Sequence, residues 1–490
     1  MKKIAKLSLV AAVAVAGLTT ANAQQLEDAI KKVEVSGSVV YRYNDYNNDT
    51  NYATEGKSTD GSKDGGVING TSTKNKGTDS FSDNNYKVGM NVAAPVNDFV
   101  KFNSRFLVAN DGGDFEGGTN NLDTSENGDL NVGVELSNAY FGFTGFKNTT
   151  INAGKQGLTT PWTVATQIDG NEQTGTGLLA LHTLNQNVTF AGAYFNQTNL
   201  DNSGSALEGA SVGGDPIGAQ DVATVGTIVA VGPVTLDAWY ADMQEVFSTY
   251  TIGAKTSTEV GGVTLGADAR YTSLQLDRNY AETSYMKAQN ITSFDTLDST
   301  YNERNNITHT SNIHDDNSLA KLTLTAKAGI LGAKASYGKT GKEGGLTALD
   351  TDATTTLLAW GVNANNKADA DFYHLQAGVD ILPELNFALN YAVVDYTGSD
   401  SVTKNANNNV TKWSNTSVEE EEFYGQLTYK MSKNLVSYVR YGVFTQDTSS
   451  HNGNTSNAGN TKGVDDKFTN DSRKDTIDDT RGRIQIAYTF

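Results

Sequence analysis

The sequence contains no cysteine in its 490 residues, and proline occurs only five times. Without cysteine, no disulfide holds the chain together and no thiolate can act as a nucleophile or a metal ligand. The chain also lacks an apolar run long enough for a membrane-spanning helix, which needs about 20 residues. Beyond the first 23 residues, the 3.6-residue periodicity of amphipathic helices is nearly absent. These absences exclude a disulfide-stapled fold, a thiol enzyme and a helical membrane protein.

Residues 1–23 have the pattern of a secretory signal peptide. Three lysines precede the short apolar run LSLVAAVAVAGL at 7–18, and ANA at 21–23 supplies a small-residue cleavage signal. We expect cleavage to leave residues 24–490 as one domain in a bacterial outer membrane. The alternative is an N-terminal anchor that stays uncut.

Negative charge predominates: 56 Asp and Glu stand against 37 Lys and Arg, for a net charge of −19. The leader carries three of the lysines, so −19 less these three positive charges gives −22 for the mature chain. Nucleic-acid binding depends on Lys and Arg at the phosphates, whereas a negative field attracts cations. We therefore expect no nucleic-acid partner and a preference for cations.

The sequence is rich in segments of roughly ten residues in which apolar and polar side chains alternate. This alternation is typical of strands in a membrane β-barrel. In one such segment, Leu385, Phe387, Leu389, Tyr391 and Val393 alternate with Asn386, Ala388 and Asn390. We predict 18 strands, at 33–46, 84–94, 99–110, 131–146, 149–156, 176–184, 187–196, 220–230, 233–243, 248–257, 260–273, 317–328, 331–339, 370–380, 385–396, 420–430, 434–447 and 480–490. The count is 16 if the weakest two, 149–156 and 176–184, are not strands.

The connections between these segments alternate between short and long. Short ones such as KN at 147–148 and VG at 231–232 are interleaved with long polar stretches such as 47–83, 274–316 and 448–479. Outer-membrane barrels have short periplasmic turns and long extracellular loops. The fold class predicted is therefore all-β, a closed antiparallel transmembrane barrel whose apolar face meets lipid. In the alternative, a soluble sandwich, that face would turn inward.

The last ten residues, RGRIQIAYTF, predict the closing strand. Ile484, Ile486 and Tyr488 would face lipid, and a terminal Phe490 resembles the signal read by bacterial barrel-assembly machinery. Tyrosines near strand ends predict the aromatic girdles of a membrane barrel; they are Tyr41, Tyr43, Tyr86, Tyr140, Tyr391 and Tyr429.

A barrel of 18 strands is too wide for its own side chains to fill, so a loop must narrow it. The stretch 157–177 after the fifth strand differs from the other long loops because it carries Trp162, Val164 and Ile168, which need a surface to pack on. We predict that this third loop folds into the lumen and places Asp169 and Glu172 at the constriction. The alternative is an outer loop with a small apolar cluster of its own.

Side-chain parity predicts that basic residues line the lumen on the first and last strands, which are neighbours once the barrel closes. This basic wall consists of Arg42, Lys87, Lys101, Arg105, Lys155, Arg440, Arg481 and Arg483. Three acidic residues are also predicted to point inward: Asp237, Asp268 and Glu422. A basic wall facing acidic Asp169 and Glu172 would produce a transverse field that orients polar solutes.

Three stretches resemble the Campylobacter-type (epsilonproteobacterial) major outer membrane porins: the leader MKKIAKLSLVAAVAVAG, the start LEDAIKKVEVSGSVVYRYN, and AGKQGLTTPWTVATQIDGNEQTGTG at 153–177. The resemblance implies an 18-stranded, trimeric, cation-preferring general porin with 153–177 as its constriction loop. It also implies that calcium can bind near the constriction, with Asp169 as the residue that carries over. From the residues alone, the acidic stretch 111–129 does not match a calcium-binding loop and is interpreted as a solvated loop.

Three other functions compete with a general porin. An outer-membrane hydrolase would need a nucleophile, a histidine and an orienting group, but the five histidines lie in no such arrangement and no G-x-S-x-G motif has the right surroundings. We therefore expect no enzymatic activity. A substrate-specific channel would show a row of lumen-facing aromatic rings, of which parity predicts only Trp239 and Phe372. A surface adhesin would use the long loops.

Overall fold

A computed structural model describes residues 32–53, 55–57, 67–69, 81–108, 134–168, 172–201, 203, 206–207, 209, 211–277, 280, 315–342, 344–398, 401–404, 410–455 and 468–490. The predicted signal peptide, the acidic stretch 111–129 and Asp169 lie outside these residues. No helix in the described ranges has the length and apolar character needed to cross a membrane.

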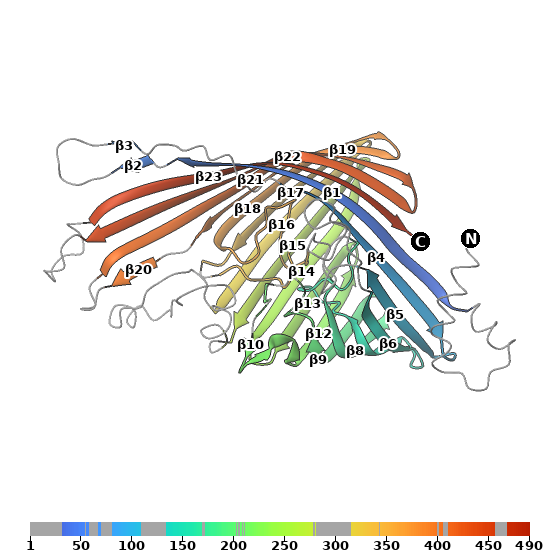
Figure 1. Cartoon of the computed structure of the whole chain (residues 1–490). Helices are drawn as coiled ribbons and strands as arrows, with labels where there is room; N and C mark the ends of the chain where they lie inside the picture. Colours follow the sequence, from blue (N-terminus) through green and yellow to red (C-terminus); the bar gives the residue numbers. More distant parts are fainter. Residues whose placement is uncertain are drawn as a thin grey trace.

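Eighteen antiparallel strands form the wall of a barrel (Figure 1). The first nine are β1 (Glu34–Ala53), β4 (Phe81–Pro95), β5 (Val100–Val108), β6 (Glu135–Phe143), β7 (Thr149–Gly157), β8 (Thr174–Asn185), β9 (Val188–Thr198), β12 (Val222–Val231) and β13 (Val234–Met243). The others are β14 (Phe247–Val260), β15 (Val263–Leu276), β16 (Asp316–Ala328), β17 (Leu331–Thr340), β18 (Ala368–Leu382), β19 (Leu385–Thr397), β21 (Val410–Ser432), β22 (Leu435–Thr455) and β23 (Phe468–Thr489). The predicted fold class and the count of 18 are confirmed, including the two weakest segments.

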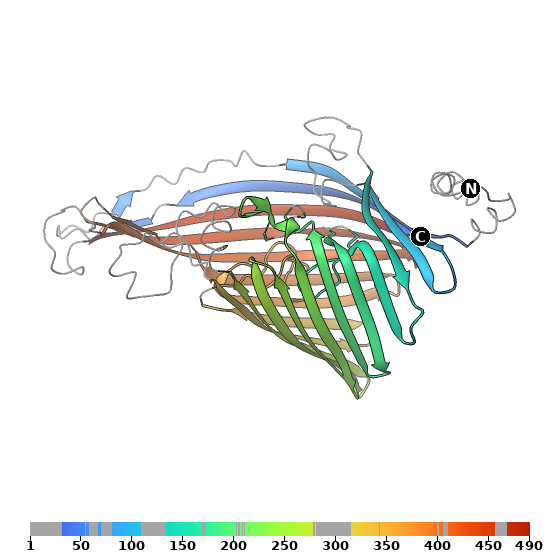
Figure 2. The same ribbon diagram turned by 90° about the horizontal axis from the view of Figure 1, so that it is seen from below.

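Several short elements lie on the extracellular side of the barrel. They are β2 (Glu55–Lys57), β3 (Val67–Asn69), β10 (Ser211–Val212), β11 (Asp215–Pro216), β20 (Ser401–Lys404) and the 3-10 turn η2 (Ile217–Ala219). The wall strands β1, β21, β22 and β23 have 20 to 23 residues and project beyond the others on this side (Figures 1 and 2). Parts of the stretches predicted as loops at 47–83 and 448–479 therefore belong to strands, because backbone pairing continues above the membrane without an apolar face.

The barrel closes between its first and last strands. β1 pairs with β4 on one side and with β23 on the other, in register from Ser38 opposite Thr489 to Ala53 opposite Lys474. Gly37 and Phe490 exchange two backbone hydrogen bonds of 3.0 Å at the periplasmic end of this seam. RGRIQIAYTF is thus the closing strand, as predicted, and closure leaves no free sheet edge.

Alternation along the strands separates an apolar outer wall from a polar lumen. On β1, Val39 and Tyr41 are exposed on the outer face, whereas Val40 and Arg42 are buried on the inner face. Tyr391 and Tyr429 also lie on the outer face, but Tyr140 shares the inner face with its cross-strand partner Asn103, so the girdle prediction is wrong for Tyr140.

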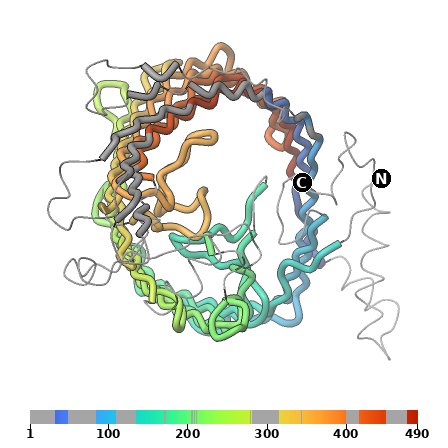
Figure 3. Tube along the Cα trace, turned by 60° about the vertical axis from the view of Figure 1, so that its left-hand side comes forward, coloured from blue at the N-terminus to red at the C-terminus, as the bar shows by residue number. Residues whose placement is uncertain are grey.

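The short connections lie at the periplasmic end. Left-handed residues allow the chain to reverse there, as at Gly232 (φ 57°) and Gly329 (φ 56°). At the opposite end, two long connections turn back inside the ring of strands, as Figure 3 shows. These two loops position the candidate site.

Candidate functional site

The loop between β7 and β8, residues 158–173 (loop 3), folds into the lumen. Trp162 is only 2% exposed and packs in an apolar cluster with Leu158, Phe195 and Leu200 on the inner face of the wall. Burying an indole ring removes a large apolar area from water, which explains why this loop leaves the solvent. Ile168, by contrast, remains 41% exposed.

A second inward loop, residues 341–367 between β17 and β18 (loop 7), meets loop 3 inside the barrel. The Leu349 amide donates to the Trp162 carbonyl (2.9 Å), and the Gln173 side-chain amide donates to the Leu349 carbonyl (3.0 Å). Thr354 Oγ1 donates to the Pro161 carbonyl (3.0 Å). Leu346 and Leu349 join the same apolar cluster as Trp162. The two loops therefore narrow the lumen as one packed unit (Figure 3).

The carboxylate of Glu172 ties loop 3 to the basic wall. Arg105 donates to both of its oxygens, from Nη2 (2.5 Å) and from Nε (2.7 Å). Lys87 Nζ lies 3.4 Å from Oε1, and the hydroxyl of Ser137 donates at 3.3 Å. The Glu172 side chain has no exposed surface. A buried carboxylate is tolerable only when it is paired in this way.

This geometry differs from the predicted one. Glu172 does not stand across the pore from the basic wall but contacts Arg105 and Lys87 directly, because a bare carboxylate inside the barrel would be costly to desolvate. The expected partner in the constriction, Asp169, lies outside the described residues.

A second buried glutamate holds loop 7. Glu422, on the inner face of β21, accepts hydrogen bonds from the backbone amides of Trp360 (2.6 Å), Gly361 (2.9 Å) and Val362 (3.4 Å). Three successive amides around one carboxylate form an anion-binding nest. A Cβ on Gly361 would lie 2.7 Å from Nη1 of Arg481, so a larger residue there would displace this guanidinium group. Glu422 faces inward, and it binds the tip of loop 7 to the inner face of β21.

Three arginines of the last two strands surround that tip. Arg440 and Arg483 are direct cross-strand partners, and their guanidinium carbons lie 5.0 and 5.7 Å from the centre of the Trp360 ring. Arg481 stacks 3.8 Å from the Phe444 ring and bonds Asp479 at 2.8 Å. Cation–π contacts of this kind are worth about 0.5–2 kcal/mol each. The basic wall therefore clamps loop 7 as well as lining the pore.

The remaining inward-facing residues lie apart from the two loops. Arg42 donates twice to Gln485, at 2.7 and 2.9 Å. Lys101 pairs with Glu34 at the exposed periplasmic mouth (2.9 Å). Asp237 receives a two-pronged contact from Arg270 at 2.7 and 2.8 Å. Asp268 faces inward opposite Lys255. Lys101 and Asp237 are thus compensated in local ion pairs.

Lys155 is the one predicted lumen residue that the structure places on the outer face. It shares this face of β7 with Ala153, whose cross-strand neighbour Leu178 is 55% exposed, and its ammonium group donates to the Leu136 carbonyl (3.2 Å). Lys155 lies at the extracellular end of β7, where a long side chain can reach the polar rim without entering hydrocarbon.

Loop 7 was missed by the sequence analysis, although it carries the signal that identified loop 3. Leu346, Leu349, Leu357 and Trp360 interrupt an otherwise polar stretch, and all four pack inside the barrel. Apolar residues in a long extracellular loop thus predict an inward fold for loop 7 as they do for loop 3.

Asp350 lies where loop 7 meets loop 3. Its side chain is largely buried, and one carboxylate oxygen accepts a hydrogen bond from the Asp352 amide (2.8 Å). Burial raises the pKa of Asp350 to about 6, and the nearby Asp352 charge adds to this while the amide hydrogen bond opposes it. The junction of the two loops thus contains a carboxyl group that titrates near neutral pH.

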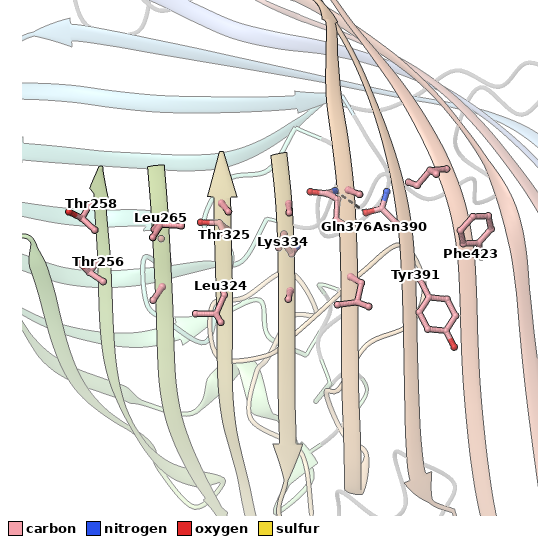
Figure 4. A pocket seen from close by; sticks show the side chains of 18 residues that line it. Thr256, Thr258, Leu265, Leu324, Thr325, Lys334, Gln376, Asn390, Tyr391 and Phe423 are labelled. Atoms are coloured by element: carbon pink, nitrogen blue, oxygen red, sulfur yellow. Dashed lines mark hydrogen bonds between the residues drawn. The ribbon is translucent and has the colours of Figure 1, made fainter. Parts of the chain in front are cut away.

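The outer wall has a shallow apolar concavity of about 750 Å³ across β14 to β21. Leu324, Tyr391 and Phe423 lie along it, as Figure 4 shows. Alanines between these larger side chains create the depression. Such a surface suits hydrocarbon rather than a water-soluble solute.

Within the described ranges, no group of three or more His, Asp or Glu side chains is arranged to hold a metal ion. The one described carboxylate of loop 3, Glu172, is already occupied by Arg105 and Lys87. The described part of the site therefore does not fit a resident calcium ion.

A closed antiparallel barrel with an apolar outer wall, a polar lumen and inward loops defines the class of outer-membrane channels. Solved structures agree on the fold. The chain is similar to Pseudomonas aeruginosa OccK2 (OpdF) in complex with glucuronate, at 12% identity and a TM-score of 0.55, covering 93% of this chain and 98% of that one. It is also similar to Acinetobacter baumannii OccAB3, at 12% identity and a TM-score of 0.56, covering 93% of this chain and 100% of that one. The similarity to Pseudomonas aeruginosa OpdK with vanillate has 12% identity and a TM-score of 0.54, covering 93% of this chain and 99% of that one.

The chain belongs to the Campylobacter major outer membrane protein family, whose model matches residues 1–468. The resemblance seen in the sequence is confirmed, and an outer-membrane location and a porin channel follow from the family and the fold. Both point to a channel without enzymatic activity. The comparison with curated proteins finds no match.

Proposed function

We propose that this protein is a general diffusion porin, a water-filled channel for passive transport of ions and small hydrophilic solutes. The inward fold of loops 3 and 7 carries the proposal, because the loops are bonded to each other and to the wall at β5 and β21, and so leave a narrowed passage. Liposome swelling with uncharged sugars of increasing size tests it. We expect swelling to slow steeply with sugar size, and equal rates for all sizes would contradict a narrowed pore.

The porin prefers cations, because the mature chain carries a net charge of −22, which is −19 less the three leader lysines. The reversal potential across a planar bilayer in a KCl gradient measures this preference. Neutralising Asp169 by Asp169→Asn weakens it. Glu172→Gln leaves Arg105 and Lys87 without their carboxylate and shifts the potential toward anions. A wild-type reversal potential close to the equilibrium potential of chloride would contradict the preference for cations.

A second candidate function is a channel that favours particular solutes. The observation in its favour is a lumen cavity rich in hydrogen-bond donors beneath loop 7. The structurally similar OccK2 in complex with glucuronate and OpdK with vanillate, both ligands being carboxylates, are consistent with it. Competition between glucuronate and an uncharged sugar in transport assays separates the two candidates, since a general porin shows none at millimolar concentrations.

Three copies assemble side by side in the membrane, and the strand that ends at Phe490 is read by the barrel-assembly machinery. Ala180 and Gly192 are direct cross-strand partners, and Gly192 also lies opposite the outward-facing Val225. Small residues on this outer face support close approach of neighbouring barrels. Native mass measurement in mild detergent tests the trimer. A monomer mass would contradict it.

A further inference from the structure

We propose that a lumen cavity beneath loop 7 is a binding subsite for the carboxylate group of small organic acids. The cavity measures about 500 Å³ and lies against the inner faces of β15 to β22. Leu358 and Ala359 of loop 7 contribute to its lining. The inference rests on the proposed channel function and names a solute class that the channel retains in passing.

Hydrogen-bond donors follow one another across neighbouring strands of this cavity. Lys334, Gln376, Asn390 and Tyr424 are successive direct cross-strand partners on β17, β18, β19 and β21. The Gln376 amide donates to Asn390 Oδ1 at 2.8 Å (Figure 4), and the ring of His374 lies 3.2 Å from the same oxygen. Because this oxygen is already engaged, the amide nitrogen of Asn390 is the atom left to face a ligand, as a donor.

No Asp or Glu lines the cavity. Of its three permanent cations, Lys327 is paired with Asp380, which also accepts from Asn386. Lys334 forms no ion pair within the described part of the chain, and the cavity therefore has an uncompensated positive charge. Other lumen cations are paired with carboxylates, as Arg270 is with Asp237 and Arg105 is with Glu172. An unpaired lysine inside a narrowed lumen is a point of attraction for a carboxylate.

Arg440 is held in a fixed orientation at the edge of this cavity. Its guanidinium carbon lies 5.0 Å from the Trp360 ring centre, 5.1 Å from that of Tyr424 and 5.2 Å from that of Tyr438. Its Nε donates to Gln426 (2.8 Å), while its two Nη groups have no partner among the described residues. A guanidinium oriented by rings offers its remaining N–H groups as a rigid fork that matches the planar geometry of a carboxylate.

The size and chemistry of the cavity select the ligand class. A volume of about 500 Å³ lies within the range for small-molecule sites and suits a solute of monosaccharide size. One lysine and one arginine match a single carboxylate. The amides of Gln376 and Asn390 and the hydroxyl of Tyr424 match the hydroxyl groups of such a solute. The predicted ligands are monoanionic hydroxy acids rather than neutral sugars.

Single-channel current in a planar bilayer tests the subsite, with millimolar glucuronate as the probe and glucose as the uncharged probe of similar size. We expect glucuronate to interrupt the KCl current of the wild type and glucose not to. Lys334→Gln should weaken the block by about tenfold or more, since it removes a charged hydrogen bond. Arg440→Lys keeps the charge but loses the fork, and should weaken the block as well. Lys255→Gln is the matched control, because it removes an inward-facing lysine outside the cavity.

The outcomes separate the subsite from the channel function. Steady conductance with no glucuronate block would overturn the subsite and leave the porin standing, whereas absence of any conductance would overturn the porin. Equal weakening by Lys255→Gln would reduce the effect to general electrostatics and contradict the subsite. Block by inorganic phosphate as strong as by glucuronate would overturn the assignment to carboxylates. Migration of unboiled Lys334→Gln on a gel at the position of the folded wild type shows that the variant is folded.

Discussion

The buried charges of the lumen act at the scale of single residues, and Glu172 is the clearest case. Its carboxylate has no exposed surface and holds Arg105 and Lys87. Replacing it by glutamine removes the carboxylate that these two buried cations share, which costs about 3–5 kcal/mol.

We predict that Glu172→Gln releases loop 3, raises single-channel conductance and exposes loop 3 to proteolysis. The control is Glu34→Gln, which removes an exposed pair with Lys101 worth at most about 1 kcal/mol. If both variants behave like the wild type, Glu172 does not anchor the loop.

Asp350 makes the junction of the loops sensitive to pH. Its pKa in the folded protein is about 6, above the usual value for aspartate, so the folded state favours the protonated form. Its contribution to stability is complete below about pH 4 and is lost as the pH rises through 6. At pH 7.5 the buried charge costs on the order of 2–3 kcal/mol.

We predict that Asp350→Asn slows hydrogen exchange of the Leu349 amide relative to wild type at pH 7.5. The difference should nearly vanish at pH 4. Comparing the two proteins at each pH cancels the intrinsic exchange chemistry. Asp215→Asn is the control, since Asp215 is exposed on β11 and does not contact Asp350. A difference of the same size at both pH values would contradict the titration of Asp350.

Parity along the strands was enough to predict that Arg42, Asp237, Asp268 and Glu422 face inward. It failed for Lys155, because β7 has only Ile151 as a large apolar residue and its phase is weakly specified. Parity also could not predict the pairing of Glu172 with Arg105, which depends on how loop 3 folds back over β4 and β5.

At the scale of elements, the closure of the barrel depends on a close approach at Gly37. A Cβ there would overlap the Gly89 carbonyl oxygen and lie 2.7 Å from the Phe490 ring. We predict that Gly37→Ala costs about 1–3 kcal/mol through overpacking, measured as a lower unfolding midpoint in guanidinium chloride. The control is Gly192→Ala, where the nearest atom to an added Cβ is 4.0 Å away. Equal midpoints for the two variants would contradict a tight seam.

Loop 7 is the element that the strand pattern alone did not locate. Alternation of apolar and polar residues predicts strands but not whether a loop folds into the lumen. The apolar content of a loop does predict this, as Trp162 did for loop 3. Trp360 does the same for loop 7, between Arg440 and Arg483.

We predict that Trp360→Ala loosens the tip of loop 7 and raises single-channel conductance, since each lost cation–π contact is worth about 0.5–2 kcal/mol. Tyr441→Ala is the control. It removes an exposed ring next to Arg440 in sequence but on the outer face of β22. A wild-type conductance in Trp360→Ala would show that the ring does not hold the loop.

At the scale of the whole molecule, the chain forms a wide closed wall and then narrows it from within. Strand number and order were predictable because every apolar face must meet lipid and every edge must be paired. The length by which β21, β22 and β23 extend above the membrane could not be predicted, because the sequence at their polar ends does not alternate between apolar and polar residues.

The central claim is that loops 3 and 7 together set the width of the pore. Its most direct test is the single-channel conductance in KCl of the wild type beside a variant in which residues 346–364 are replaced by a short Gly-Ser linker. We predict stepwise conductance in both and clearly larger steps in the variant, because removing loop 7 also releases loop 3. Steps of equal size in a folded variant would contradict the claim.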